Sequence, residues 1–414
     1  MSEEEQLVAD VLDIGEGMLL SGAEVSRVED AVIRLLHAYG SVKTDVITIL
    51  SNIEVTATFP EGERITELRR IRAAEYDIDY RALESWNALS RRLCASPLDR
   101  TARQREIEGI RTECLATKKR KCLRAAGYIL SAAVFTMFFG GGIEQALAAA
   151  CGGGVLYGCS RLFDKLYLQN LLKIFLLSFI GGVLCIPPAL LKLEVGPIAV
   201  GYIMLVIPGV AITVSVRDML TGDTISGALR MLESLVSTCF IGIGLAVAML
   251  LSGGLISGSG MTGLAERPLM QVITAGLGAV AFSLLYQTEP KRYFLCLCAG
   301  ALAWSVFLLA ERADMGLFLA NLCAGAVGTL FAECMARLKK LPATVVLAAA
   351  IIPLVPGRTL YLTMDSIVHG ASAAAVQYAE TTAVVAFGVA AGTVLISSAY
   401  RSFALFRQKK STGA

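Results

Sequence analysis

The sequence predicts a mostly α-helical membrane protein, with ten transmembrane helices in two five-helix halves related as an inverted repeat, behind a small N-terminal α+β domain. Its 414 residues are 55% hydrophobic, with a mean hydropathy of +0.63, which is too apolar for an ordinary soluble protein. One unusual pattern also occurs twice. Ile207-Pro208-Gly209 and Val355-Pro356-Gly357 are each followed by a glycine fourteen residues after the proline.

Charge divides the chain into a soluble part and an apolar part. Residues 1–123 hold 18 Lys and Arg against 22 Asp and Glu, whereas the remaining residues hold 19 against 13. We therefore expect a cytoplasmic α+β domain over residues 1–117. The N-terminus has no basic segment followed by an apolar core, so we expect no cleavable signal peptide.

The first 117 residues show both helical and strand periodicity. Apolar spacing predicts helices over 7–19 and from Val25 to Gly40, and again over 78–94 and 98–117. Residues 42–59 are rich in Val, Ile and Thr, which predicts two strands that turn at Ser51-Asn52. A third short strand is expected over 64–68.

Ten apolar segments follow, each near the ~20 residues that a bilayer requires. They are 125–141, 143–160, 171–191, 196–216, 229–252, 268–287, 293–310, 315–335, 343–364 and 377–400. Five lie in a first half (118–252) and five in a second half (268–402). A Gly- and Ser-rich outer linker (253–267) joins the halves, and a cytoplasmic tail (403–414) ends the chain.

The basic residues predict the orientation of these spans. With the N-terminal domain inside, the inner segments carry nineteen Lys and Arg and the outer segments only three. This asymmetry follows the positive-inside rule and places both termini in the cytoplasm. Because five spans per half reverse the direction, the two Pro-Gly spans, each the fourth of its half, run antiparallel as an inverted repeat requires.

Several classes of function lack the residues they need. A net charge of +2 without a concentrated basic face gives no support for nucleic-acid binding. The eleven cysteines have no disulfide or zinc spacing, and the only histidines are His37 and His369, so we expect no metal and no cofactor. No Walker A, HExxH or GxSxG motif occurs, so neither an ATP-driven pump nor a familiar hydrolase is indicated.

The two Pro-Gly pairs are the main candidate for a solute site. At Pro208-Gly209 and Pro356-Gly357 the helical hydrogen-bond ladder is interrupted, and backbone groups freed at membrane depth must be satisfied by protein or line a watery cavity. Such groups bind the carboxylate and ammonium of a zwitterion, the carboxylate at a helix N-terminus. A purely structural kink is the alternative.

Three polar residues follow the second pair. Arg358 lies near the middle of its span, where it either clamps a substrate carboxylate or forms a structural ion pair with Glu380 or Glu144. Thr359 and Tyr361 follow at alternating positions, so they do not share one helix face. Only some of these side chains can therefore line a site.

The carboxylates near the breaks are candidates for gating and proton coupling: Asp218, Asp223, Asp365, Glu380 and Glu144. At ~1.5 Å per residue, Asp218 and Asp365 lie ~15 and ~13 Å from the midplane on opposite sides, which argues against an intramembrane aspartyl protease. Since no other catalytic motif occurs, we do not expect an enzyme. Each aspartate could instead serve one gate or carry a proton. Asp218 and Asp223 equally suit a capped surface loop, and Glu380 equally suits an interfacial glutamate.

Several segments resemble the threonine/serine exporter family. They are residues 22–29 (Gly-Ala-Glu-Val-Ser-Arg-Val-Glu), 64–71, 83–93 and 207–224. From Leu354 onward the second half resembles the smaller partner that some members carry as a separate chain. The resemblance implies a fused, proton-driven exporter of threonine, serine and related small amino acids in the plasma (inner) membrane. It also places Glu24, Arg27 and Glu29 in a family signature, although a helix cap and a charge pair within the helix explain them equally.

The resulting hypothesis is a secondary exporter that works by alternating access. Its expected partners are a small amino acid, protons and the lipid bilayer. The sequence is compatible with a homo-oligomer but does not determine the oligomeric state. Two alternatives remain: a membrane sensor or scaffold whose N-terminal domain binds a partner, and a channel for small solutes.

Overall fold

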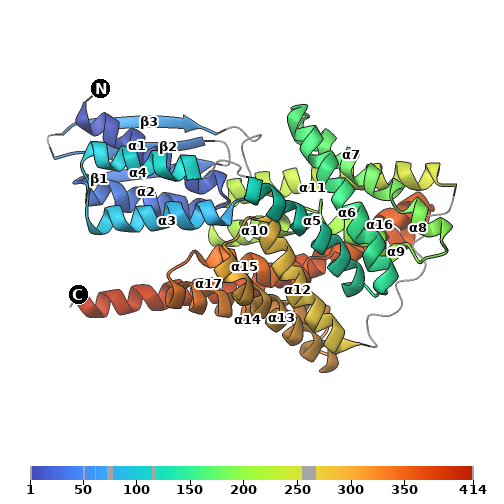
Figure 1. Cartoon of the computed structure of the whole chain (residues 1–414). Helices are drawn as coiled ribbons and strands as arrows, with labels where there is room; N and C mark the ends of the chain where they lie inside the picture. The colour runs from blue at the N-terminus through green and yellow to red at the C-terminus, as the bar shows by residue number, and fades with distance from the viewer. Residues whose placement is uncertain are drawn as a thin grey trace. The chain divides into compact units, whose positions relative to one another are not determined.

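The computed structural model describes residues 2–49, 52–60, 62–71, 78–113, 118–253 and 267–412, and these are mostly helical (Figure 1). Its contacts form two compact units. The first, here called the N-terminal unit, comprises Met1–Lys121 together with Tyr286–Glu289 and Lys339–Val345. The second, the helical unit, comprises Cys122–Leu285, Pro290–Leu338 and Val346–Ala414.

In its described residues the N-terminal unit has four helices that lie wholly within it and a three-stranded antiparallel sheet in the order β1-β2-β3 (Figure 1). Its elements are α1 (Glu3–Leu20), α2 (Val25–Ala38), β1 (Lys43–Ile49), β2 (Asn52–Thr58), β3 (Arg64–Arg70), α3 (Tyr80–Ala95) and α4 (Arg100–Glu113). The register pairs Val46 with Val55 and Val55 with Glu67. The small sheet predicted from the Val, Ile and Thr pattern is therefore confirmed.

The alternation of buried and more exposed side chains along β2 explains how the sheet packs in this unit. Ile53, Val55 and Ala57 are fully buried, whereas Glu54 between them is exposed, so one face of the sheet packs on α1 and α2. A Cβ on Gly17 of α1 would overlap the indole of Trp86, so this glycine allows α1 and α3 to pack closely.

Helices make up the described part of the helical unit. In chain order they are α5 (Lys118–Phe138), α6 (Ile143–Lys165), α7 (Asn170–Val183), α8 (Ile186–Leu190), α9 (Gly196–Met204), α10 (Gly209–Thr221), α11 (Thr224–Leu251), α12 (Pro268–Leu285), η2 (Pro290–Arg292), α13 (Tyr293–Arg312), α14 (Leu317–Lys339), α15 (Ala343–Ile351), η3 (Ile352–Leu354), α16 (Gly357–Val368) and α17 (Ser372–Thr412). The predicted tail after residue 402 continues α17 as helix, and the predicted outer linker lies almost entirely outside the described residues.

Eight helices in the described ranges are long and apolar enough to cross a membrane, and the bent pair α15–η3 and α16 raises the number to nine. The sequence predicts ten. The difference lies in the span predicted over 196–216, because it consists of α9 with nine residues and α10 with thirteen, and neither alone spans a bilayer. The tenth span and the inverted repeat stay predictions.

Small residues set the packing of the long helices. A Cβ on Gly182 of α7 would overlap Ala248 of α11, and one on Gly244 would lie 2.5 Å from the carbonyl oxygen of Phe175. The Ser178 hydroxyl also donates to the carbonyl oxygen of Ile241 at 2.7 Å. Close approach through small residues and hydroxyl bonds is typical of helices packed in lipid.

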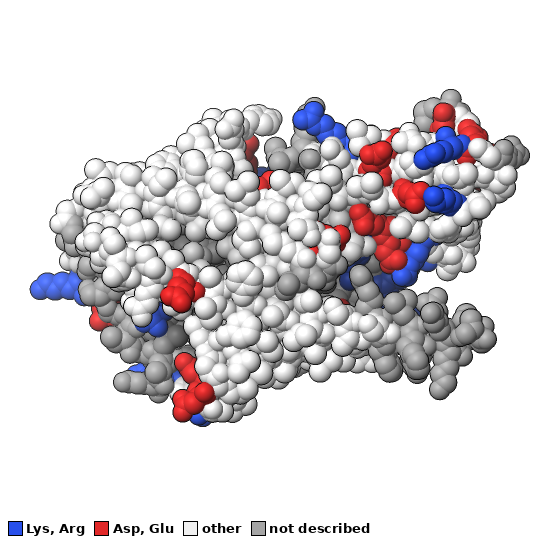
Figure 2. Space-filling model, turned by 180° about the vertical axis from the view of Figure 1, so that it is seen from behind, with Lys and Arg blue, Asp and Glu red and all other residues white. Residues whose placement is uncertain are grey.

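Large apolar side chains remain exposed on these helices. Leu147 is 64% exposed, Leu235 53% and Phe387 53%. Figure 2 shows one face on which a broad area carries neither acidic nor basic side chains. Water disfavours such a surface, and the hydrocarbon of a bilayer accepts it.

Candidate functional site

Both predicted breaks occur at the predicted prolines. Pro208 occupies the N-cap of α10 and Pro356 the N-cap of α16, so each Pro-Gly pair starts a new helix. The two prolines share one conformation, with φ −79° and ψ 44° at Pro208 and φ −75° and ψ 49° at Pro356. The second break bends its helix pair by 44°. The repeated sequence thus forms a repeated local structure.

The two breaks pack directly against each other. A Cβ on Gly209 would overlap the side chain of Val355, and a Cβ on Gly357 would overlap the sulfur of Met204. Ile207 also lies 3.7 Å from that second position. Each glycine therefore contacts the residues that precede the other break. This reciprocal contact brings two distant parts of the chain to one place in the helical unit.

Each break places a helix N-terminus beside the end of the preceding helix. In α10 the N–H of Ile212 donates to the carbonyl oxygen of Pro208 at 2.9 Å, and in α16 that of Leu360 donates to Pro356 at 3.1 Å. The amides before these bonds lie at the positive end of a helix dipole, while the ends of α9 and η3 present carbonyl oxygens. A zwitterion needs these two kinds of group.

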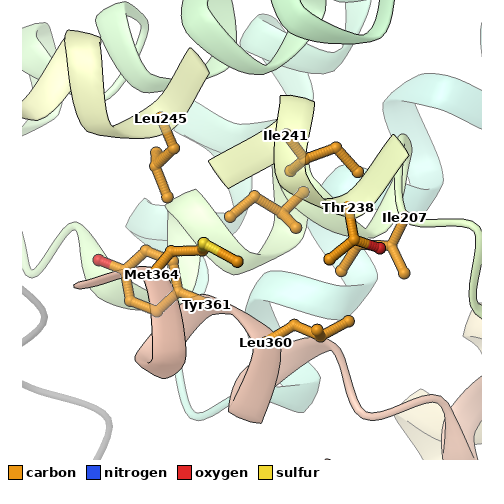
Figure 3. A pocket seen from close by; sticks show the side chains of 8 residues that line it. Ile207, Thr238, Ile241, Leu245, Leu360, Tyr361 and Met364 are labelled. Atoms are coloured by element: carbon orange, nitrogen blue, oxygen red, sulfur yellow. The ribbon is translucent and has the colours of Figure 1, made fainter. Parts of the chain in front are cut away.

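A small apolar pocket lies beside the breaks (Figure 3). Its lining comes from α9, the first break, α11 and α16: Ile203, Ile207, Thr238, Ile241, Leu245, Leu360, Tyr361 and Met364. The space admits about one water molecule, which is too small for an amino acid. Met364 forms one wall by packing on Gly242, where a Cβ would displace it. Met364 therefore closes one side of this pocket.

Tyr361 is the predicted site residue that reaches this pocket. Its side chain is fully buried, and its hydroxyl has no hydrogen-bond partner among the described residues. A buried hydroxyl without a partner is costly, so it is a candidate for binding a ligand.

Thr359 is tied to the neighbouring helix. Its hydroxyl donates to the carbonyl oxygen of Pro356 at 3.0 Å and accepts a bond of 2.7 Å from Thr382 of α17. Thr382 therefore supports the second break from outside it. The sequence does not reveal this residue, because a lone threonine in an apolar span carries no distinguishing signal. Arg358 lies half-buried in the first turn of α16.

The carboxylates occupy different environments. Asp218 is 5% exposed and pairs with Arg230 of α11 at 3.3 Å. Asp223 is the N-cap of α11 after Gly222, whose φ of +105° favours glycine. The Asp223 side chain forms no cap bond with α11, so the capped-loop interpretation stays a prediction.

Asp365 and the two glutamates lie elsewhere in the helical unit. Nδ1 of His369 lies 3.4 Å from Oδ1 of Asp365 and 2.8 Å from its carbonyl oxygen. Glu144 in the first turn of α6 and Glu380 on α17 are both exposed. Of these three carboxylates, Asp365 is thus the least exposed.

Comparison with protein families identifies the chain. Residues 11–252, which include the first break, match the model described as putative threonine/serine exporter. The chain belongs to the threonine/serine exporter family. Residues 271–399, which include the second break, match a further model, Threonine/Serine exporter, ThrE, so this exporter is a fused form. No curated protein and no solved structure matches it.

Family membership and the long apolar helices agree. A threonine/serine exporter is a transporter, and several helices of this chain are long and apolar enough to cross a membrane. The resemblance stated from the residues is confirmed, and this exporter is a multi-pass membrane protein.

Proposed function

We propose that this exporter moves threonine, serine and related small amino acids out of the cell, and that the substrate binds where the two breaks meet. The observation that carries the proposal is the reciprocal packing of Gly209 on Val355 and of Gly357 on Met204. Broken helices in the two parts of a transporter commonly form its solute site.

The groups at the breaks suit an α-amino acid. In this proposal the substrate carboxylate binds the N-termini of α10 and α16, with Arg358 supplying a fixed positive charge. The ammonium group binds carbonyl oxygens at the ends of α9 and η3. The hydroxyl of Tyr361 contacts the substrate, and the apolar pocket accepts its side chain.

The closed pocket supports alternating access. Because the space beside the breaks admits about one water molecule, the described conformation excludes the substrate and must open to receive it. Met364 and the two breaks are the parts that we expect to move. We assign the N-terminal unit and the end of α17 to the cytoplasm, because the basic residues gather in the inner connections.

We further propose that protons drive export and that Asp365 carries them. It is partly buried, and Nδ1 of His369 lies 3.4 Å from its Oδ1. Asp218, by contrast, is neutralised by Arg230 and in this proposal holds α10 to α11.

The test is transport by purified protein in liposomes loaded with labelled threonine, with and without an imposed pH gradient. The proposal expects efflux that the gradient accelerates. Arg358→Ala should lower efflux at least tenfold while the protein stays folded in the membrane. Arg312→Ala, an exposed change at the end of α13, is the matched control and should have no effect.

The two alternatives give different results in the same assay. A scaffold moves no threonine under any gradient. A channel equilibrates threonine down its own gradient but never accumulates it when only a pH gradient is imposed.

A further inference from the structure

The N-terminal unit includes two short segments that come from the second half of the chain. Tyr286–Glu289 follows α12, and Lys339–Val345 contains the first residues of α15. Both segments lie within the region matched by the second family model, whereas α1 to α4 lie in or before the first. The same compact unit therefore joins elements of both family regions.

A buried carboxylate makes one of these contacts. Glu24 is 8% exposed and stands at the N-cap of α2, but its side chain forms no cap bond with that helix. Instead, its Oε1 accepts a bond of 3.0 Å from the hydroxyl of Thr344, which is also 8% exposed. A carboxylate needs donors in so buried a place, and Thr344 supplies one.

A tyrosine pair makes the second contact. The N–H of Tyr80, the first residue of α3, donates to the carbonyl oxygen of Tyr286 at 2.9 Å. Their rings pack edge to face with centroids 5.5 Å apart. Tyr286 directly follows Leu285, the last residue of α12.

A short, nearly continuous stretch of helix connects Thr344 to the second break. From Thr344, α15 continues without interruption to Ile351 and then through η3 to Leu354, just before Pro356-Gly357. A helix fixed at its first turn cannot slide along its axis unless that contact is broken. The bond to Glu24 therefore acts on the first turn of the helix that leads to the second break.

We propose that Glu24 is a positioning residue for transport, which acts through Thr344 and α15 on the second break. This inference rests on the proposed function. Glu24 contacts no substrate, so its loss should change the rate of the conformational cycle and leave substrate affinity unchanged. Losing the contact frees the first turn of α15, and with it the segment that leads to the second break, from Glu24, and turnover falls.

A double-mutant cycle in full-length protein tests this role. Initial rates of labelled threonine efflux from liposomes give kcat and KM for Glu24→Ala, Thr344→Val and the double variant. We expect about a tenfold lower kcat in each single variant, with KM within about twofold of wild type. The double variant should be no slower than either single one, because both remove the same bond.

Conservative variants provide a rescue. Glu24→Gln keeps an acceptor oxygen and Thr344→Ser keeps the hydroxyl, so both should retain most of the wild-type kcat. If Glu24→Ala does not fold, the comparison of Thr344→Val with Thr344→Ser carries the test alone.

Asp10→Asn is the matched control for damage to the unit. It weakens a buried ion pair with Arg103, 2.7 Å long, that joins α1 to α4 and does not contact Thr344. It should lower the melting temperature and leave kcat unchanged. Equal slowing by Asp10→Asn, additive effects in the double variant, or normal kcat in Glu24→Ala would overturn the proposal.

Hydrogen exchange of the purified protein separates this proposal from the proposed function. Thr344→Val should speed amide exchange over Ala343–Ile351, while Thr344→Ser should not. Unchanged exchange would reject the positioning role even in a protein that exports nothing. If Thr344→Val exchanges faster but the wild-type protein moves no threonine, only the proposed function is rejected.

Discussion

The backbone of Gly209 lies directly against the side chain of Val355, two residues before the matching glycine of the second break. Two segments from different family regions can approach this closely only where one of them lacks a side chain. The same holds in reverse for Gly357 and Met204. These contacts make the two breaks one structural element, and the first two predictions follow from them.

Gly209→Ala should disrupt this element. The added Cβ would overlap Val355, whose branched side chain is stiff, so the helices must separate. We expect efflux of labelled threonine to fall at least tenfold, with a lower melting temperature. Gly158→Ala is the control, because no atom lies within 4 Å of a Cβ there. Val355→Ala, which removes the overlapping methyl groups, should partly restore Gly209→Ala, and normal efflux in Gly209→Ala would contradict this account of the contact.

Gly357→Ala should have a milder effect. Its Cβ would meet the sulfur of Met204, and a methionine side chain is flexible enough to move aside. We expect a two- to fivefold loss of efflux, measured in parallel with Gly209→Ala. A larger loss than in Gly209→Ala would show that the glycine itself, rather than the space beside it, matters at the second break.

Both break positions could be predicted from sequence because proline and glycine act locally. Proline removes a backbone donor whatever surrounds it, and in the structure each Pro-Gly pair starts a helix. The strands of the N-terminal unit were predictable for a similar reason, since alternation along Ile53 to Ala57 marks a half-buried sheet.

The contacts between distant segments could not be predicted. In an apolar span nearly every residue suits lipid or protein, so nothing marked Ile241 and Leu245 of α11 as pocket residues or Thr382 as a partner of Thr359. The pairing of Glu24 with Thr344 was hidden too, because a glutamate before a helix suggests a cap.

Tyr361→Phe should weaken substrate binding without lowering the stability of the fold. The removed hydroxyl has no hydrogen-bond partner among the described residues, so the melting temperature should stay equal or rise. If the hydroxyl binds substrate, KM for threonine should rise about three- to tenfold. Tyr202→Phe is the control, since its hydroxyl donates to the carbonyl oxygen of Ala148 at 3.2 Å. Tyr202→Phe should lower the melting temperature and leave KM unchanged. An unchanged KM in Tyr361→Phe would show that Tyr361 is not part of the site.

Asp365→Asn should uncouple transport from protons. Without a titratable carboxyl, the variant should exchange internal for external threonine yet fail to respond to a pH gradient. The measurement compares counterflow with gradient-driven transport in the same liposomes. Asp164→Asn, which removes an exposed pair with Lys173 2.5 Å apart, is the control and should stay coupled. A normal response to the gradient in Asp365→Asn would exclude this residue as the proton carrier.

The N-terminal unit should show a pH dependence that arises from Glu16. Burial raises the pKa of this carboxyl above its ordinary value of 4.5, and the nearby charge of Arg69 only partly offsets the effect. Because the folded pKa lies above the unfolded one, its contribution to stability is full below about 4.5 and is lost as pH rises through the folded pKa.

Glu16→Gln removes this titration. The melting temperature of the variant relative to that of wild type should therefore rise as pH increases from about 4 to 7. Glu108→Gln, at an exposed residue of α4, should show a smaller pH dependence. A difference for Glu16→Gln that does not change with pH would contradict the assignment.

The central claim is that one substrate molecule binds to both breaks at once. Equilibrium binding of labelled threonine to purified full-length protein tests it most directly, in wild type, Gly209→Ala, Gly357→Ala and the control Gly158→Ala. The account predicts saturable binding in wild type and the control, and weaker binding after substitution at either break. Wild-type affinity in both break variants, with the protein folded, would contradict it.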